Sequence, residues 1–245
     1  QRISRLDGID KASGRAKYTS DYNKPNQLQT AMLACPFAHA KVKSIDTSAA
    51  EKMPGVKGIH LIVKPGDEIQ WAGWEVAFVA AETEPQAHDA ARAIKVEYDV
   101  LDHVVQEHDL KKAGNRAKAS GEKMEGDPDA ALKEADAVSE GTYGIPVIAH
   151  CCLEPHGNVI QFDGSKAEFN PSTQAVTPIQ ADLARQLEIP AANVHVHMDH
   201  IGGGFGSKFQ SDRWGIASAH LSKQNNGRPV KVYLDRASEM TIAGV

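Results

Sequence analysis

The residues best suited to chemistry in this sequence lie in the segment HMDHIGGGFGSKFQSDRW, residues 197–214. Four glycines surround Phe205 within residues 202–206, and Lys208 follows two positions later. Glycine permits positive φ angles and allows the main chain to come close to another group. So many glycines exceed the need of a simple turn. The pattern is typical of a loop whose backbone amides approach a bulky anionic ligand.

The loop differs at one position from each of two well-known glycine-rich motifs. A phosphate-binding P-loop requires lysine directly after its last glycine, but Ser207 separates Gly206 from Lys208. The dinucleotide fingerprint GxGxxG requires a third glycine where this sequence has Ser207. The loop therefore predicts a ligand other than a simply bound nucleotide.

Histidines near the loop offer metal binding as an alternative chemistry. One group comprises His195, His197 and His200 with Asp199, and a second comprises His150, Cys151, Cys152, Glu154 and His156. Two of these histidines share one face of a predicted strand, and no fourth ligand is evident. We favour histidines that are hydrogen-bonded or face solvent, and we predict no residue that binds a metal directly.

Glu154 could serve as a general base, but its segment CLEPHGNV favours another role. In a stretch rich in proline and glycine, we expect a buried carboxylate that holds a neighbouring loop through backbone N–H groups. The three cysteines are too few and too irregular for a disulfide framework, and no CxxC pair suggests an iron–sulfur cluster. All three are predicted to be buried as small apolar side chains.

The composition excludes several functional classes. The chain has 245 residues, 41% hydrophobic residues and a net charge of -5, as expected for a globular protein of one large or two modest domains. The negative charge argues against nucleic acid or an anionic membrane as the main partner. No apolar run approaches the length of a membrane span.

The elements that must position the loop follow from local patterns. In the first hundred residues, strands are predicted over 27–35, 56–63, 74–82 and 95–100, and helices over 47–53 and 84–94. A polar stretch without periodicity predicts a linker over 107–126. A helix capped by Asp127 and a strand over 136–145 follow.

The remaining residues predict the frame of the loop itself. A hairpin about Gly164 joins residues 158–164 to 166–170, and a helix capped by Thr177 places Ile179, Leu183 and Leu187 on one face. A strand over 193–199 leads into the glycines, a helix over 213–223 leaves them, and a last strand spans 228–235. The loop is therefore predicted between a strand and a helix, where anionic ligands are commonly held.

Several segments together resemble the molybdopterin-binding large subunit of the xanthine dehydrogenase/aldehyde oxidase family of molybdenum hydroxylases. They are the glycine loop, STQ at 172–174, LEPH at 153–156, RLDGIDKASGRAKYTSD, VAFVAAETEPQAHDAARAIKVEYD, QLEIPAANVHV and RPVKVYLDRASEM. The resemblance implies an α+β fold. It places an α/β-hammerhead domain over 1–106, a linker over 107–126 and the N-terminal part of the molybdenum cofactor-binding domain over 127–245.

The family's motifs imply roles for particular residues. Gln174 matches the glutamine that hydrogen-bonds an oxo ligand of molybdenum. Phe205 and Gly206 match the pair that lies beside the metal, and Gly203 and Gly204 would admit the pterin. Purine-oxidising members carry a glutamate where this chain has Phe209, so the resemblance implies an aldehyde or aromatic heterocycle as substrate, with Phe209 in its pocket.

The family's catalytic glutamate lies far beyond this length, so no catalytic residue is expected on this chain. We expect a fragment, or one half of a split subunit, that is inactive alone. The resemblance implies hydroxylation with water as oxygen source, molybdopterin in its cytosine dinucleotide form, and partner subunits that carry [2Fe-2S] clusters and FAD. A non-catalytic cofactor-holding or assembly module is the alternative. The cytoplasm is the expected compartment, with the periplasm as alternative.

Overall fold

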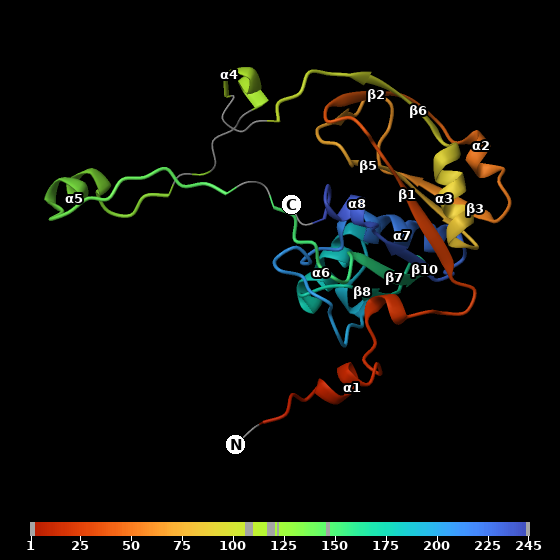
Figure 1. Cartoon of the computed structure of the whole chain (residues 1–245). Helices are drawn as coiled ribbons and strands as arrows, with labels where there is room; N and C mark the ends of the chain where they lie inside the picture. The colour runs from red at the N-terminus through yellow and green to blue at the C-terminus, as the bar shows by residue number, and fades with distance from the viewer. Residues whose placement is uncertain (1–2, 106–109, 117–120, 122, 146–147, 244–245) are drawn as a thin grey trace. The chain divides into compact units, whose positions relative to one another are not determined.

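The computed structural model describes residues 3–105, 110–116, 121, 123–145 and 148–243 (Figure 1). The chain divides into two compact units. The larger combines residues 1–101 with 149–245, and the smaller comprises 102–148. In the larger unit, segments far apart in sequence build one sheet. Among the described residues, no helix combines the length and apolar character needed to span a membrane.

The large sheet has seven strands and contains the strands that flank the glycine loop. In spatial order they are β3 (Val56–Leu61), β5 (Glu75–Ala81), β1 (Leu28–Ala34), β10 (Val230–Tyr233), β7 (Gly157–Phe162), β8 (Ala167–Pro171) and β9 (Val194–Val196). The pairs β1–β10 and β8–β9 are parallel, and the other neighbours are antiparallel. Strands from both sides of the proposed linker therefore share one sheet.

A smaller antiparallel sheet consists of β4 (Glu68–Ile69), β2 (Ala40–Asp46) and β6 (Lys95–Val100). Residues at alternate positions of β2, Ala40 and Val42, are buried, while the lysines between and after them are exposed. This period of two is the pattern of a strand with one buried face.

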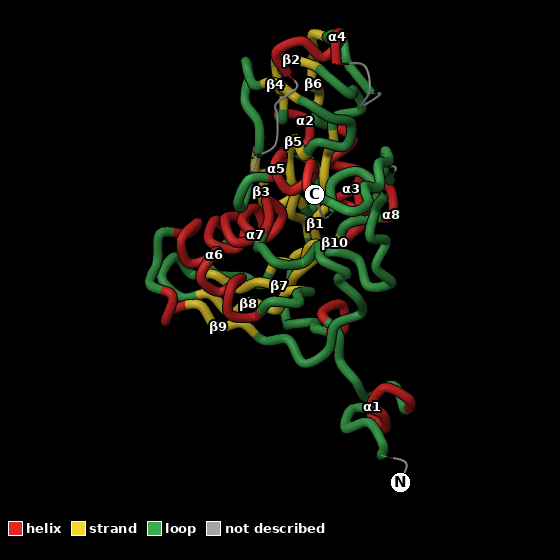
Figure 2. Tube along the Cα trace, turned by 90° about the vertical axis from the view of Figure 1, so that its left-hand side faces the viewer, coloured by secondary structure: helices red, strands yellow, loops and turns green. Residues whose placement is uncertain are grey.

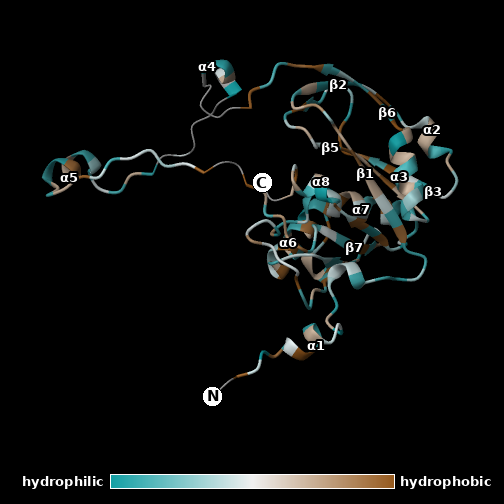
Figure 3. Cartoon of the chain, viewed as in Figure 1, coloured by the Kyte–Doolittle hydropathy of each residue, from teal (hydrophilic) through white to brown (hydrophobic). Residues whose placement is uncertain are grey.

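The strand β5 shows how the two faces of the large sheet are covered, because all of its residues are buried. Phe78 and Ala80 point into the core beneath α6 (Val176–Leu187) and α7 (Asp212–Gln224). Val79 and its alternate neighbours face the opposite core, which contains apolar side chains of α3 (Glu84–Ala93) and β2. Figure 2 shows α6 and α7 beside β7 and β8, and Figure 3 shows β1 largely in hydrophobic colours.

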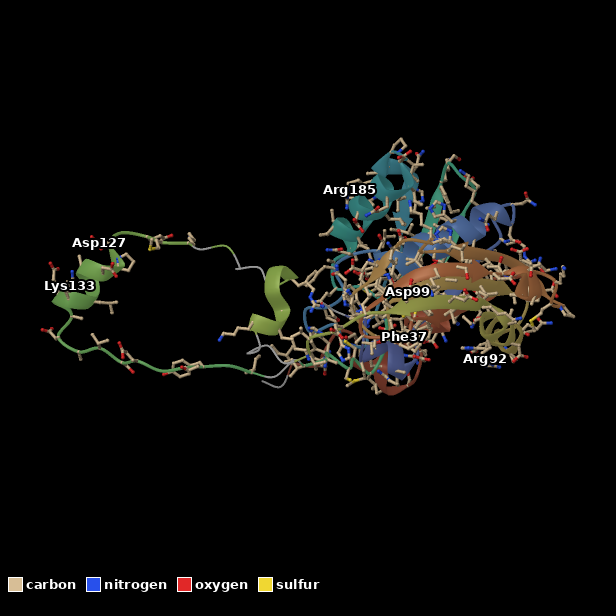
Figure 4. The ribbon with its side chains drawn as sticks, turned by 90° about the horizontal axis from the view of Figure 1, so that it is seen from above. Phe37, Arg92, Asp99, Asp127, Lys133 and Arg185 are labelled. Carbon is tan, nitrogen blue, oxygen red and sulfur yellow. The ribbon has the colours of Figure 1, made fainter. Side chains whose placement is uncertain are left out.

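Local sequence signals explain the helices α3 and α6. Thr83 accepts a hydrogen bond from the backbone N–H of Gln86, and Gln86 reaches back to the N–H of Thr83, which forms a capping box at α3. In α6, Ile179 and Leu183 are buried on one face. Arg185 lies on the outer side of α6, where it pairs with Asp182 (Figure 4).

The shorter elements connect these layers. In the larger unit they are α1 (Gly8–Ala12), η1 (Thr19–Asp21), α2 (Ser48–Glu51), η3 (Ala191–Asn193) and α8 (Arg236–Glu239). The smaller unit contains α4 (Leu110–Ala113), η2 (Gly114–Arg116) and α5 (Pro128–Glu134). Asp127 caps α5 by accepting a hydrogen bond from the N–H of Ala130 (Figure 4 labels Asp127).

Most of the predicted elements are present, with shifted ends. The hairpin about Gly164, the strands at 27–35 and 74–82, and the helices at 84–94 and 213–223 correspond to β7–β8, β1, β5, α3 and α7. The strand β2 escaped prediction, although alternation of apolar and polar residues marks it.

Two predictions about local structure are wrong. The segment 136–145 forms no strand, because its described residues are exposed and have no neighbouring strand to pair with. The helix α6 is capped at Ala175, two residues before Thr177. The hydroxyl of Thr173 accepts a hydrogen bond from the N–H of Ala175, which fixes the turn earlier than the sequence pattern implied.

Candidate cofactor site

The glycine loop connects β9 to α7 and contains a tight turn at its tip. The N–H of Ser207 donates to the carbonyl of Gly204 at 3.0 Å. The two residues inside this turn, Phe205 and Gly206, have φ angles of 54° and 106°. Positive φ at both central positions is the arrangement that glycine favours and that most other residues resist. The loop thus presents the backbone of Phe205 in an uncommon conformation.

Gln174 holds this turn from the other side. It follows β8 closely, and its side-chain Oε1 accepts hydrogen bonds from the N–H groups of Gly206 at 3.0 Å and Lys208 at 3.3 Å. The N–H of Gln174 in turn donates to the carbonyl of Lys208 at 3.0 Å. Residues 174 and 206, more than thirty positions apart in sequence, are therefore in direct contact.

These hydrogen bonds also orient the amide of Gln174. Both partners are donors, so only the amide oxygen can face them. The Nε2 group must point elsewhere, and it has no hydrogen-bond partner within the part of the chain that the structure describes. The exposed side chain of Gln174 thus offers two N–H donors beside the glycine loop.

Two glycines of the loop are favoured for different reasons, Gly204 by close approach and Gly203 by its backbone conformation. A Cβ atom on Gly204 would lie 2.2 Å from Oε1 of Gln174, which is far inside contact distance. A Cβ atom on Gly203 would lie 3.0 Å from the ring of Phe205, and the φ of Gly203 is 105°. The chain therefore excludes side chains where the loop meets the amide of Gln174.

Glu154 anchors the start of the loop, as the sequence predicted. Its Oε2 accepts hydrogen bonds from the N–H of Gly202 at 2.7 Å and from the hydroxyl of Ser172 at 3.0 Å. Its Oε1 accepts a hydrogen bond from the N–H of Thr19 at 3.2 Å. A buried carboxylate with these partners positions backbone rather than taking protons from a substrate.

Lys208 anchors the other end of the loop from inside the protein. Its Nζ donates to the carbonyl of Glu154 at 2.7 Å and to the hydroxyl of Ser172 at 2.6 Å, and it lies 3.9 Å from the carboxylate of Glu154. Burial lowers the pKa of Lys208, and the charge of Glu154 opposes that effect. This lysine therefore joins the loop to its support and does not project toward a ligand.

A second buried pair supports the turn through His156. The Nδ1 of His156 lies 3.0 Å from the carboxylate of Glu239, and its Nε2 lies 3.3 Å from the carbonyl of Ser207. Burial alone would raise the pKa of Glu239, but hydrogen bonds from the side chain and N–H of His156 outweigh it and lower the pKa. The pair links α8 to the glycine loop.

The predicted cofactor-binding residues lie together, and the predicted substrate-pocket residue Phe209 lies on the same loop. Gln174 and the loop residues Gly203, Gly204, Phe205 and Gly206 lie together. Phe205 is 75% exposed, and Phe209 is 47% exposed. Phe209 follows the buried Lys208, so the same loop carries both aromatic side chains to the surface. The role of Phe209 in a substrate pocket stays a prediction.

The other residues considered for chemistry have different positions. His195 and His197 both bind the carboxylate of Glu168 on β8, at 3.0 and 2.9 Å, and all three side chains are exposed. Across the described ranges, no three histidine, cysteine or acidic side chains are arranged to hold a metal ion.

The three cysteines are free, and two of them, Cys35 and Cys152, are buried as predicted. The prediction for Cys151 is wrong, because this residue is exposed. Its φ is 43°, and its sulfur lies 3.0 Å from the sulfur of Met240. The turn that leads to Glu154 places it at the surface.

Sequence reasoning missed two residues that belong to this region. Lys208 drew attention only as a displaced P-loop lysine, and nothing in its neighbourhood indicated complete burial. His150 drew attention only as a metal ligand, yet its Nε2 lies 3.7 Å from the position that a Cβ on Gly206 would take. Its Nδ1 is buried without a hydrogen-bond partner among the described residues.

These features fit a bulky polar cofactor. The backbone at Gly204 and Gly206 carries no side chain, and the amide of Gln174 beside it offers N–H donors that are unpaired within the described chain. The exposed amide of Gln174 and the open backbone at Gly204 are therefore accessible to a ligand with its own polar groups. The fold is that of an α+β protein with a glycine loop accessible to a ligand.

Comparison with protein families specifies the class. Residues 108–245 match the model of the molybdopterin cofactor-binding domain, and residues 13–64 match that of the aldehyde oxidase and xanthine dehydrogenase a/b hammerhead domain. The chain belongs to the xanthine dehydrogenase/aldehyde oxidase family of molybdenum hydroxylases and carries its molybdopterin-binding domain. The predicted family and fold class are confirmed.

Similar proteins include oxidoreductases of several organisms. The chain is 31% identical to the mouse xanthine dehydrogenase/oxidase over 95% of its own length and 19% of that protein. It is 31% identical to the molybdenum-binding subunit of an Escherichia coli aldehyde oxidoreductase, over 96% of its own length and 34% of that subunit. The chain therefore spans about a third or less of these relatives.

Solved structures show the same fold. The Cu,Mo-CO dehydrogenase superposes with a TM-score of 0.81 at 25% identity, over 97% of this chain and 35% of that one. Quinoline 2-oxidoreductase from Pseudomonas putida superposes with a TM-score of 0.79 at 24% identity, over 97% of this chain and 34% of that one.

Proposed function

We propose that this chain is the molybdopterin-binding component of a hydroxylase that oxidises an aldehyde or an aromatic heterocycle with water as the oxygen source. In this proposal, the chain contributes five residues to the cofactor site: Gln174, Gly203, Gly204, Phe205 and Gly206. The bound molybdenum cofactor would supply the two-electron redox chemistry. The chain's own residues bind and orient it.

The orientation of the Gln174 amide carries this proposal. Its oxygen is held by two backbone N–H groups, so its Nε2 is directed away from the loop backbone and can donate to an oxygen of a bound ligand. A donor held in place before the ligand arrives stabilises negative charge on that ligand without a cost of reorganisation. Gly204 leaves the approach to this donor free of side chains.

The proposed substrate class follows from the aromatic side chains next to the turn. Phe205 and Phe209 are exposed on the same loop as the cofactor-contacting backbone. Aromatic faces favour flat, apolar reactants, and no carboxylate stands at position 209 to bind a purine. Relatives at 31% identity include an aldehyde oxidoreductase subunit as well as a xanthine dehydrogenase/oxidase.

We place the catalytic base, the [2Fe-2S] clusters and FAD on polypeptide outside these residues, and we propose that the chain is inactive alone. Two observations support this: the chain spans 34% of the E. coli molybdenum-binding subunit, and it contains only three cysteines. We propose the cytosine dinucleotide form of the cofactor, which acid hydrolysis and mass analysis of the released nucleotide would identify. The cytoplasm is the proposed compartment, which cell fractionation would test against the periplasm.

Two substitutions of Gln174 test the proposal in the complete protein with its partner subunits. Gln174→Glu keeps an oxygen for Gly206 and Lys208 but removes the N–H donors, whereas Gln174→Ala removes both. We expect both variants to fold, to retain molybdenum and to turn over an aromatic aldehyde at least about tenfold more slowly, because one charge-stabilising donor is typically worth that much or more.

The outcome distinguishes an enzyme component from a non-catalytic module. Unchanged turnover in both variants would remove Gln174 from the site. A folded wild-type protein that contains molybdopterin but oxidises no aldehyde, heterocycle or purine would support a module that holds the cofactor without catalysis. Preference for purines would overturn the proposed substrate class.

A further inference from the structure

The segment DAVSEGTYGI, residues 136–145, lies in the smaller unit and has the composition of a β-strand, yet it forms none within the described residues. Its large apolar side chains, Val138, Tyr143 and Ile145, are 53%, 87% and 75% exposed. Branched and aromatic side chains are enriched in strands, where neighbouring side chains pack against them. The segment therefore exposes the kind of residue that a sheet ordinarily covers.

The backbone of this segment is also without partners. None of its N–H or C=O groups makes a hydrogen bond with another described residue. Glycine adopts positive φ readily, but neither Gly141 nor Gly144 does so, and no other residue of the segment does. No left-handed turn therefore interrupts the segment, and its backbone groups are available for a strand ladder.

The smaller unit does not cover these side chains by itself. No side chain is buried in the described part of this unit, and Leu132 of its helix α5 is 57% exposed. Fixing the backbone of each residue costs roughly 1–2 kcal/mol, which burial of apolar surface must offset. A unit without a core of its own leaves that cost uncompensated, so its order depends on other polypeptide.

The family relationship indicates which polypeptide that is. The match to the molybdopterin cofactor-binding domain spans residues 108–245, so this segment and the glycine loop belong to one domain. The chain spans 34% of the E. coli molybdenum-binding subunit, so most of such a subunit lies outside these residues.

We propose that residues 136–145 form a β-strand that pairs with a strand of the polypeptide that completes the molybdopterin-binding subunit. This inference rests on the proposed function, in which the catalytic base lies on that polypeptide. Pairing supplies main-chain hydrogen bonds along the segment. Tyr143 and Ile145 are two positions apart and share one face of such a strand, so the completed sheet covers them together.

Amide hydrogen exchange in the complete protein tests the strand. We expect the amides of 136–145 to exchange at least about a hundredfold more slowly than in an unstructured peptide of the same sequence. Successive N–H groups of a strand point to opposite sides, so Ser139→Pro or Glu140→Pro must remove a ladder hydrogen bond and accelerate exchange at least about tenfold. Ser139→Thr and Glu140→Thr keep the N–H and are the matched controls, expected to exchange like wild type.

A photo-reactive phenylalanine analogue in place of Tyr143 identifies the partner by cross-linking in the same protein. We expect cross-links to the part of the subunit outside these residues. Cross-links only to this chain or to a separate subunit would overturn the inference, as would wild-type exchange at the rate of an unstructured peptide. If the proline variants fail to fold, wild-type exchange and the cross-links decide. A protected segment in a protein without molybdopterin would overturn the proposed function but support this strand.

Discussion

At the scale of single residues, the site is defined by what holds the glycine loop. Glu154 binds the N–H of Gly202 at the start of the loop, and Lys208 lies at its other end. Both side chains are buried, and both form a hydrogen bond with the hydroxyl of Ser172. Their charges lie 3.9 Å apart, so each offsets the cost of burying the other. The loop can present an uncommon backbone because these two side chains fix its ends.

The substitution Glu154→Gln tests this structural role. The neutral amide cannot accept hydrogen bonds from Gly202, Ser172 and Thr19 as a carboxylate does, and it leaves the ammonium of Lys208 without its counter-charge. We expect a loss of about 3 kcal/mol in the free energy of unfolding, as when one partner of a buried pair is removed. Urea denaturation of the complete protein measures it. A normal unfolding curve combined with abolished turnover would instead indicate a catalytic base.

The substitution Gly204→Ala tests the close approach to Gln174. Because the added Cβ would lie 2.2 Å from Oε1, either the amide or the turn must move. We expect molybdopterin content to fall severalfold, with a stability loss of about 1–3 kcal/mol. Gly144→Ala is the matched control, since its added Cβ meets no described atom within 4 Å. Equal cofactor content in both variants would contradict the assigned role of Gly204.

The sequence predicted this site unevenly, for physical reasons. The need for glycine is local, so the glycine run at 202–206 stood out by residue type and spacing, while the cofactor roles of its members came from the family resemblance and stay predictions. The packing role of Glu154 followed from its proline- and glycine-rich context. The burial of Lys208 was hidden, because it depends on Ser172 and on the carbonyl of Glu154, both distant in sequence. The unpaired nitrogen of His150 is likewise a property of three-dimensional packing alone.

At the scale of elements, β3 and α7 meet through two histidines. His60 on β3 and His220 on α7 stack with ring centroids 4.9 Å apart and an angle of 10° between the rings. Burial, and then the neighbouring His220, lowers the pKa of His60 to about 4. Burial and the charge of Lys223 also lower the pKa of His220.

This pair predicts a particular pH dependence of stability. The unfolded chain takes up a proton at His60 near its ordinary pKa of about 6.5, whereas the folded chain resists it down to about pH 4. The contribution of neutral His60 to the free energy of unfolding is therefore complete above the pKa of His60 in the unfolded chain. It declines as the pH falls from about 7 toward 4. His60→Phe should flatten this part of the stability profile, measured as melting temperature against pH. An unchanged slope would contradict the assignment.

Whether an element could be predicted depended on where its partners come from. The capping box of α3 and the amphipathic face of α6 are encoded within a few residues, and both helices were foreseen. The start of α6 and the fate of 136–145 depend on other segments, and there the sequence misled. A strand is stable only when it pairs with a neighbouring strand, and a pattern of alternating residues does not show whether such a neighbour is present.

At the scale of the whole molecule, the parallel contact between β1 and β10 joins the early and late parts of the chain. Leu28 is fully buried opposite Val230, and its N–H donates to the carbonyl of Pro229 at 2.8 Å. In the large sheet, every strand on one side of this contact precedes residue 101, and every strand on the other side follows residue 149. We therefore expect the larger unit to unfold as one cooperative body, although residues 102–148 interrupt it in sequence.

Leu28→Ala tests that cooperativity. Removal of the buried side chain should cost about 2–5 kcal/mol. If the sheet opens as one body, amide hydrogen exchange in the complete protein should accelerate by similar factors in β5 and in β7, on either side of the junction. Ile9→Ala, at an exposed position of α1, is the control. Acceleration confined to β5 would show that the two halves open independently.

The enclosure of Lys208 also bears on how the native protein meets a protease. Trypsin must draw a lysine side chain out into its specificity pocket, and this lysine is only 1% exposed with its ammonium engaged by Glu154 and Ser172. The peptide bond after it should resist digestion long after bonds at surface lysines such as Lys133 are cut. The burial of Lys208 therefore protects the glycine-rich loop from trypsin at the lysine after which trypsin would cleave.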